Sequence, residues 1–157
     1  MIEKLSQEEI FDVLENNYIG RISCADGMKS YIVPITYSFD RATQTVISHS
    51  GEGMKLRMLR ANPNVCFETE QIEDIHHWKT VIAWGNYEEM EGTYARNELH
   101  KMVSRLRELL RVDHPHLQYL SDMSNSQITG GIDIIYHIKL TEFSGRAQTS
   151  DEIPGFK

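Results

Sequence analysis

Apolar side chains recur at every second position in two long segments of the chain, 30–39 and 132–141. A period of two places successive side chains on opposite faces of a β-strand, so each segment predicts a strand with one strongly apolar face. One-sided strands of this kind are typical of antiparallel sheets. The alternating positions are Tyr31, Val33, Ile35, Tyr37 and Phe39 in the first segment, and Ile132, Ile134, Tyr136, Ile138 and Leu140 in the second.

Four other segments predict strands, at 18–24, 45–49, 65–70 and 78–91. The pair Asp26–Gly27 suits a tight hairpin turn, and residues 40–44 suit a longer one. Gly85 interrupts the last of these strands, which indicates a bulge or a close approach of two backbones. Residues 113–131 are predicted to be irregular, and the polar tail from Gly145 onward to be loose.

Three segments predict helices. Ser6 and Glu9 match the S-x-x-E capping box, in which the two side chains satisfy each other's free backbone donors. A short helix opens near Met54 and stops at Asn62–Pro63, and a longer one with an apolar stripe follows Thr93. Hairpin-linked strands with few helices predict a mainly β (α+β) fold. We expect a six-stranded antiparallel barrel with flanking helices, formed by a single domain over residues 1–157.

The charge balance excludes several classes of partner. With 16 basic and 23 acidic residues the formal net charge is −7, which argues against nucleic acid and against anionic membranes. No apolar run approaches the roughly 20 residues needed to span a bilayer, and the acidic N-terminus does not resemble a signal peptide. The two cysteines, Cys24 and Cys66, fit no disulfide scaffold or metal-site spacing. A cytoplasmic protein is therefore expected.

The segment Ser48–Lys55 carries the clearest chemical signal. A strand ends in Ser48-His49-Ser50, two glycines allow a tight turn, and a helix then begins with Lys55 in its first turn. Free N–H groups at a helix N-terminus favour an anion, and a lysine there opposes the helix dipole unless something compensates it. A bound phosphate would do so, although a solvated lysine after a flexible loop would give the same sequence.

A second irregularity is Pro34, in an otherwise strand-like segment. Proline cannot donate to a sheet ladder, so it belongs at an edge or a bulge. A bulge would free backbone groups for a ligand, whereas a plain edge strand needs no ligand.

Four motifs follow one another along the chain: Tyr31–Tyr37, His49-Ser50 with Gly53 and Lys55, Asn62–Glu68, and Trp78–Ile82 with Gly85. In this order they resemble the pyridoxamine 5′-phosphate oxidase-related flavoproteins, and within them the branch of the nitroimidazole-resistance proteins. The closing segment Ser144-Gly145-Arg146 is also similar to that family's last strand, with arginine in place of the usual lysine.

This resemblance implies a split β-barrel that binds FMN, as a homodimer with two flavins at the subunit interface. It implies that Val33, Pro34, Ile35 and Thr36 run along the flavin ring, that His49 and Ser50 lie near the cofactor, and that Lys55, with Met54 beside it, binds the phosphate. Positions like Thr80 and Trp84 would line the ring or the dimer seam. The oxidase's own substrate-binding pattern is missing from the sequence.

The sequence thus predicts an FMN-dependent oxidoreductase acting on a small electron-poor substrate such as a nitroaromatic. A flavin brings its own redox chemistry, and no catalytic acid, base or metal site stands out. The alternative is a non-enzymatic protein that stores or senses a flavin or haem, with His49 or His76–His77 as haem ligands. A third hypothesis is an interaction module with an empty pocket. The His114-Pro115-His116 run could chelate a metal but lacks a third ligand with obvious spacing.

Overall fold

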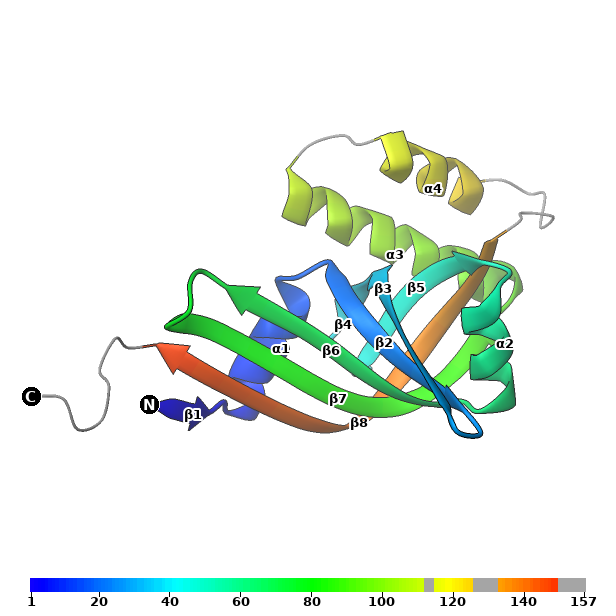
Figure 1. Cartoon of the computed structure of the whole chain (residues 1–157). Coiled ribbons are helices and arrows are strands. Elements are labelled where there is room, and N and C mark those ends of the chain that lie inside the picture. The colour runs from blue at the N-terminus through cyan, green and yellow to red at the C-terminus, as the bar shows by residue number, and fades with distance from the viewer. Residues whose placement is uncertain (112–114, 126–132, 150–157) are drawn as a thin grey trace, which may run out of the picture.

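The computed structural model describes residues 1–111, 115–125 and 133–149. Its strands form one antiparallel sheet in the order β3-β2-β6-β7-β8-β5-β4, with β1 added beside β8. The sheet curves strongly, and the helices lie around it (Figure 1). The strands are β1 (Ile2–Lys4), β2 (Ile19–Asp26), β3 (Lys29–Thr36), β4 (Ser38–Asp40), β5 (Thr45–Gly51), β6 (Asn64–Ile72), β7 (His77–Met90) and β8 (Asp133–Thr149).

The helices are α1 (Gln7–Glu15), α2 (Met54–Ala61), α3 (Gly92–Leu110) and α4 (Pro115–Asn125). The first begins at the predicted capping box, with Ser6 and Glu9 bonded to each other's backbone N–H. The second ends at Asn62, before Pro63, as predicted. No described helix is long and apolar enough to cross a membrane.

The mainly β fold with flanking helices is confirmed, with three corrections. The sheet has eight strands, because Tyr37 separates β3 from β4 and because β1 pairs with the end of β8. The predicted loose tail is wrong up to Thr149, since Gly145–Thr149 pairs with β7. The predicted irregular segment contains α4, which Pro115 opens at a position where its missing N–H costs nothing. Residues 112–114, 126–132 and 150–157 lie outside the described residues.

Two glycines act where the sequence predicts. Gly27 has a positive φ of 58° in the turn between β2 and β3, where Asp26 and Lys29 pair. At Gly85 the register between β7 and β8 shifts, and a Cβ there would lie 2.1 Å from the carbonyl oxygen of Lys139. The bulge and the close approach are therefore the same feature.

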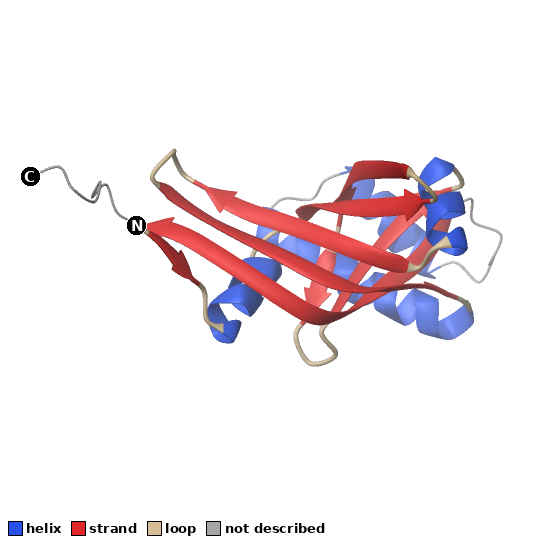
Figure 2. Ribbon diagram, turned by 60° about the horizontal axis from the view of Figure 1, so that its bottom comes forward, coloured by secondary structure: helices blue, strands red, loops and turns tan. Residues whose placement is uncertain are grey.

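The inner face of the curved sheet and one face of α1 enclose the main apolar core. A second cluster lies where α3 and α4 pack on Ile47 of β5. In Figure 2 the long strands cross the front of the molecule, with helices behind them and at their sides. The buried residues of α1 in the main core are Ile10, Phe11, Val13 and Leu14.

Candidate functional site

The N-terminus of α2 has no side-chain cap. Its N-cap residue is Gly53, with extended backbone and no hydrogen bond from a side chain to the first turn. The first N–H groups of a helix have no partner within the helix. They are therefore available to a group that approaches this end of the molecule, where β5 leads into α2 at the right of Figure 1.

Lys55 lies in this first turn, partly buried. Its Nζ is 5.9 Å from the centroid of the Tyr136 ring, so the ammonium lies over an aromatic face. Burial lowers the pKa of Lys55. Among the described residues it forms no ion pair, whereas Arg60 of the same helix is paired with both Glu52 and Glu89. Lys55 is thus a desolvated positive charge without a counter-charge from the described chain.

Tyr136 lies beneath this lysine, and its buried hydroxyl lacks a hydrogen bond. It is fully buried, its ring packs 5.2 Å from that of Tyr87, and its hydroxyl has no hydrogen-bond partner in the described part of the protein. Burial raises the pKa of Tyr136. A buried hydroxyl left unpaired costs free energy. The open helix end, the unpaired ammonium and this hydroxyl lie at one end of the barrel, and their chemistry suits an anion such as a phosphate.

His49 and Ser50 lie at the end of β5, but on opposite faces. His49 is in register with Ile135, whereas Tyr136 points to the other face of the sheet. The Nδ1 atom of His49 lies 3.1 Å from Oδ2 of Asp133. Ser50 donates to the carbonyl oxygen of Gly51. His49 therefore lies on the sheet face opposite Tyr136 and Lys55.

The run Val33–Thr36 lies on β3, the last strand at one end of the sheet. Pro34 is in register with Arg21 without a shift, so the proline marks an edge strand and not a bulge. Ile35 is buried toward the core, while Pro34 is exposed on the outer face. The Thr36 carbonyl oxygen accepts a 2.7 Å hydrogen bond from Ser48, which ties this edge to β5.

Thr80 and Trp84 project from the outer face of β7. Thr80 donates to Glu68 at 3.4 Å. Trp84 is 39% exposed and stands between Cys66 on β6 and Glu142 on β8. It also lines a cleft of about 430 Å³ with the carboxamides of Asn64 and Asn86. The predicted site residues are therefore dispersed: Met54 (41% exposed) and Lys55 lie at the α2 end, Thr80 and Trp84 lie on the outer face, Ile35 is buried in the core, and His49 lies on the face opposite Tyr136.

The outer face also carries a charged cluster that the sequence reasoning missed. Nη1 of Arg21 lies 3.0 Å from Glu68 and 2.7 Å from Glu70. Burial, followed by hydrogen bonding to Glu70, raises the pKa of Glu68 to about 6. The pKa of Glu70 is lowered, first by its hydrogen bond with Glu68 and then by Arg21. The available signal was the period-two spacing of the two glutamates, which places both on one face.

The remaining histidines form no recognisable metal site among the described residues. His77 contacts Asp74 at 2.9 Å, and His76 lies 3.3 Å from Gln148. His114 lies outside the described residues, and the side chain of His116 is not described either.

Comparisons with known proteins agree with this architecture. A family model described as pyridoxamine 5′-phosphate oxidase matches residues 6–147. A FAD-binding protein from Mesorhizobium loti is 24% identical, with a TM-score of 0.74 over 96% of this chain and 98% of that one. The FAD-binding protein from Mycobacterium smegmatis is also 24% identical, with a TM-score of 0.61 over 94% of this chain and 100% of that one.

Two other comparisons add a resistance-related structure and a curated relative. A Bacteroides thetaiotaomicron structure named for 5-nitroimidazole antibiotic resistance is 14% identical, with a TM-score of 0.60 over 94% of this chain and 89% of that one. It supports the shared fold and not membership of that branch. An uncharacterized protein of Rhizobium meliloti is 29% identical over 92 residues, which are 59% of this chain and 60% of that protein's length.

Proposed function

Since the chain belongs to the pyridoxamine 5′-phosphate oxidase family, whose model matches residues 6–147, we propose that it is a flavin-dependent oxidoreductase that binds FMN. The observation that carries this proposal is the half-buried Lys55 ammonium, which has no counter-charge among the described residues and lies over the ring of Tyr136. A phosphate would supply the missing charge and accept hydrogen bonds from the first turn of α2.

The chain's own residues would bind and orient the cofactor. Lys55 and the N–H groups of α2 would hold the phosphate. The edge strand β3 offers the Pro34 carbonyl oxygen and the Thr36 N–H to the ring, because these groups face its free side, with which no described strand pairs, whereas the backbone groups of Val33 and Ile35 face β2. A bound flavin supplies the electron transfer, so the protein need only position it and exclude water.

The proposal includes a homodimer with the flavin at the subunit interface. Its support is the outer sheet face, where Ile32, Ile82 and Trp84 are 69%, 38% and 39% exposed. Apolar side chains gathered on one face favour an interaction surface. Sedimentation of the flavin-loaded protein tests this part, and a monomer at micromolar concentration would contradict it.

The substrate is proposed to be a small electron-poor molecule, such as a nitroaromatic. Visible absorbance of the purified protein, followed by titration with FMN and then FAD, tests the cofactor. Saturable binding of FMN is expected, and a protein that retains neither flavin would overturn the proposal. Oxidation of a reduced pyridine nucleotide, with and without a nitroaromatic acceptor, separates an oxidoreductase from a protein that only stores or senses a flavin.

A further inference from the structure

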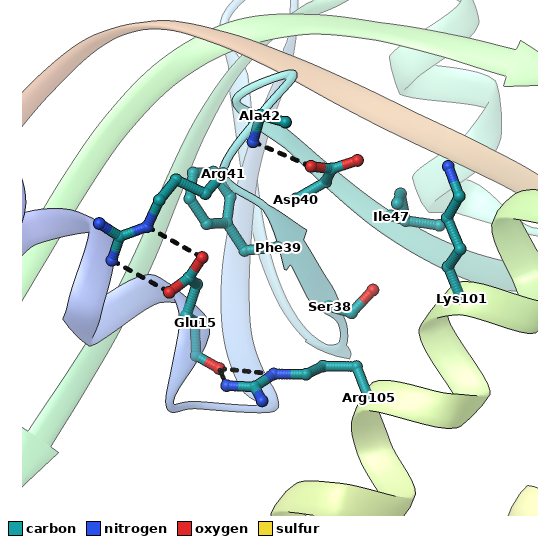
Figure 3. A pocket seen from close by; sticks show the side chains of 9 residues that line it. All are labelled: Glu15, Ser38, Phe39, Asp40, Arg41, Ala42, Ile47, Lys101 and Arg105. Carbon is teal, nitrogen blue, oxygen red and sulfur yellow. Dashed lines mark hydrogen bonds and ion pairs between the residues drawn. The ribbon is translucent and has the colours of Figure 1, made fainter.

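A cleft of about 440 Å³ lies between α1, the β4–β5 turn and α3. Figure 3 shows its walls: Glu15 and Arg41 on one side, Lys101 and Arg105 of α3 on the other, and Ser38, Asp40 and Ile47 between them. None of the residues proposed to contact the flavin lines this cleft. Any ligand that it takes would therefore bind at a second site.

The two arginines of the cleft are bound to other groups of the protein. Nε and Nη2 of Arg41 bind both carboxylate oxygens of Glu15 at 3.0 Å. Nη2 of Arg105 donates to the Glu15 carbonyl oxygen at 2.7 Å, and its Nη1 donates to Glu108. These bonds join α1, α3 and the turn into a fixed wall, in which the arginines serve as structure.

Three other polar groups have capacity left for a ligand. Asp40 accepts the Ala42 N–H at Oδ1 but forms no ion pair within the described chain. Ser38 is 4% exposed, and its hydroxyl has no hydrogen-bond partner there. Lys101 holds Glu98 at 2.7 Å, which leaves two of its three ammonium protons.

Asp40 and Lys101 both line the cleft, as Figure 3 shows. The pKa of Lys101 is raised, first by its bond to Glu98 and, to a smaller extent, by the charge of Asp40. The apolar side chain of Ile47 lies between them in Figure 3. The cleft thus presents an anion and a cation to one ligand, with Ile47 buried at 1% exposure.

We propose that this cleft binds a small zwitterion, such as an amino acid, whose ammonium contacts Asp40 and Ser38 and whose carboxylate contacts Lys101. A simple anion would meet the carboxylates of Asp40 and Glu15, and a simple amine would meet Lys101 and Arg105. Only a molecule that carries both charges is complementary to both walls.

Calorimetric titration of the full chain with 4-aminobutyrate and leucine tests the proposal, with butylamine and butyrate as single-charge analogues. At least one zwitterion should bind about ten-fold or more tightly than both analogues, since one charged hydrogen bond is worth about 1.5–3 kcal/mol. If neither zwitterion binds, or if butyrate or butylamine binds as tightly, the proposal is wrong.

Two substitutions test which residue contacts the ammonium of the zwitterion and which contacts its carboxylate. Asp40→Asn keeps an acceptor for the Ala42 N–H, and Lys101→Met keeps most of the apolar stem, so both variants should fold. Each should weaken zwitterion binding about ten-fold or more. The matched controls are Asp26→Asn and Lys29→Met in the exposed β2–β3 hairpin. Equal loss in the controls, or no loss in the cleft variants, would contradict the assignment.

Discussion

Helices α1 and α2 flank the same sheet, yet they differ in how many of the polar groups around them have partners within the protein. A capping box closes the start of α1, and the Tyr37 hydroxyl donates to the Leu14 carbonyl oxygen near its end. The start of α2 has no cap, the Lys55 ammonium has no ion pair, and the Tyr136 hydroxyl has no partner within the described residues. Polar groups that the protein satisfies itself hold the fold, whereas those that it leaves unpaired at the start of α2 make up the proposed cofactor site.

The largest expected effect is on the cofactor. Lys55→Met should weaken FMN binding about 10- to 150-fold, the equivalent of losing one charged hydrogen bond of about 1.5–3 kcal/mol. It should not destabilise the flavin-free protein, because burial already disfavours the Lys55 charge and lowers its pKa. Fluorescence titration and urea unfolding measure the two quantities. The control is Arg57→Met on the exposed side of the same helix, and equal loss of affinity there would remove Lys55 from the site.

Two buried tyrosines test the contrast directly. Tyr37→Phe should lower the free energy of unfolding by about 1–3 kcal/mol, because it leaves the buried Leu14 carbonyl oxygen without its donor. Tyr136→Phe should leave the stability of the flavin-free protein unchanged or raise it, since its hydroxyl has no bond to lose. Urea unfolding of both variants measures this difference. Equal destabilisation would mean that the two hydroxyls are equally well satisfied.

Removal of the capping box at the start of α1 should have a smaller effect, on the stability of the protein. Ser6→Ala should cost about 1 kcal/mol, because the N–H of Glu9 loses its acceptor and the start of α1 is left open like that of α2. Thermal unfolding of the flavin-free protein measures the loss. FMN affinity should not change, since α1 lies outside the proposed cofactor site, and a parallel drop in affinity would undermine the separation of the two helices.

The smallest expected effect is the pH dependence of stability that comes from Glu68. This carboxylate shares one arginine, Arg21, with Glu70, so it is only partly compensated. Its pKa is raised from 4.5 to about 6 in the folded protein, so the folded state holds this proton more tightly than the unfolded chain. The resulting stability is present below pH 4.5 and is lost as the pH rises toward about 6. Solvent screening keeps it small.

Urea unfolding of the natural protein and of Glu68→Gln from pH 4 to 7 measures this contribution. The variant should gain stability relative to the natural protein as the pH rises across that range. A gap that stays constant with pH would show that Glu68 does not titrate there.

Much of the fold could be predicted because its signals are local. The alternation in 30–39 and 132–141, the capping box at Ser6 and the bulge at Gly85 each depend on neighbouring residues. Strand β1 gave no such signal, since its three residues are exposed and are held by backbone pairing to β8. Helix α4 was missed because residues 113–131 were predicted to be irregular, although Pro115 is well tolerated in the first turn of a helix.

The candidate site was predictable only in part. The sequence indicated Lys55 through its place after two glycines, but it could not show that Tyr136 lies beneath the ammonium. The sequence left open whether Pro34 lies in an edge strand or at a bulge, and the unshifted pairing with β2 shows that it lies in an edge strand. The Arg21 cluster depends on the register of β2 and β6, which no local pattern specifies. Contacts between distant strands are what the sequence alone leaves open.

The most direct test of the account compares FMN with riboflavin, which lacks the phosphate, on the natural protein and on Lys55→Met. The account predicts that FMN binds the natural protein more tightly than riboflavin does, and that most of this preference is lost in the variant. If the variant weakens both ligands equally, or keeps the full preference for FMN, the phosphate does not bind at the start of α2.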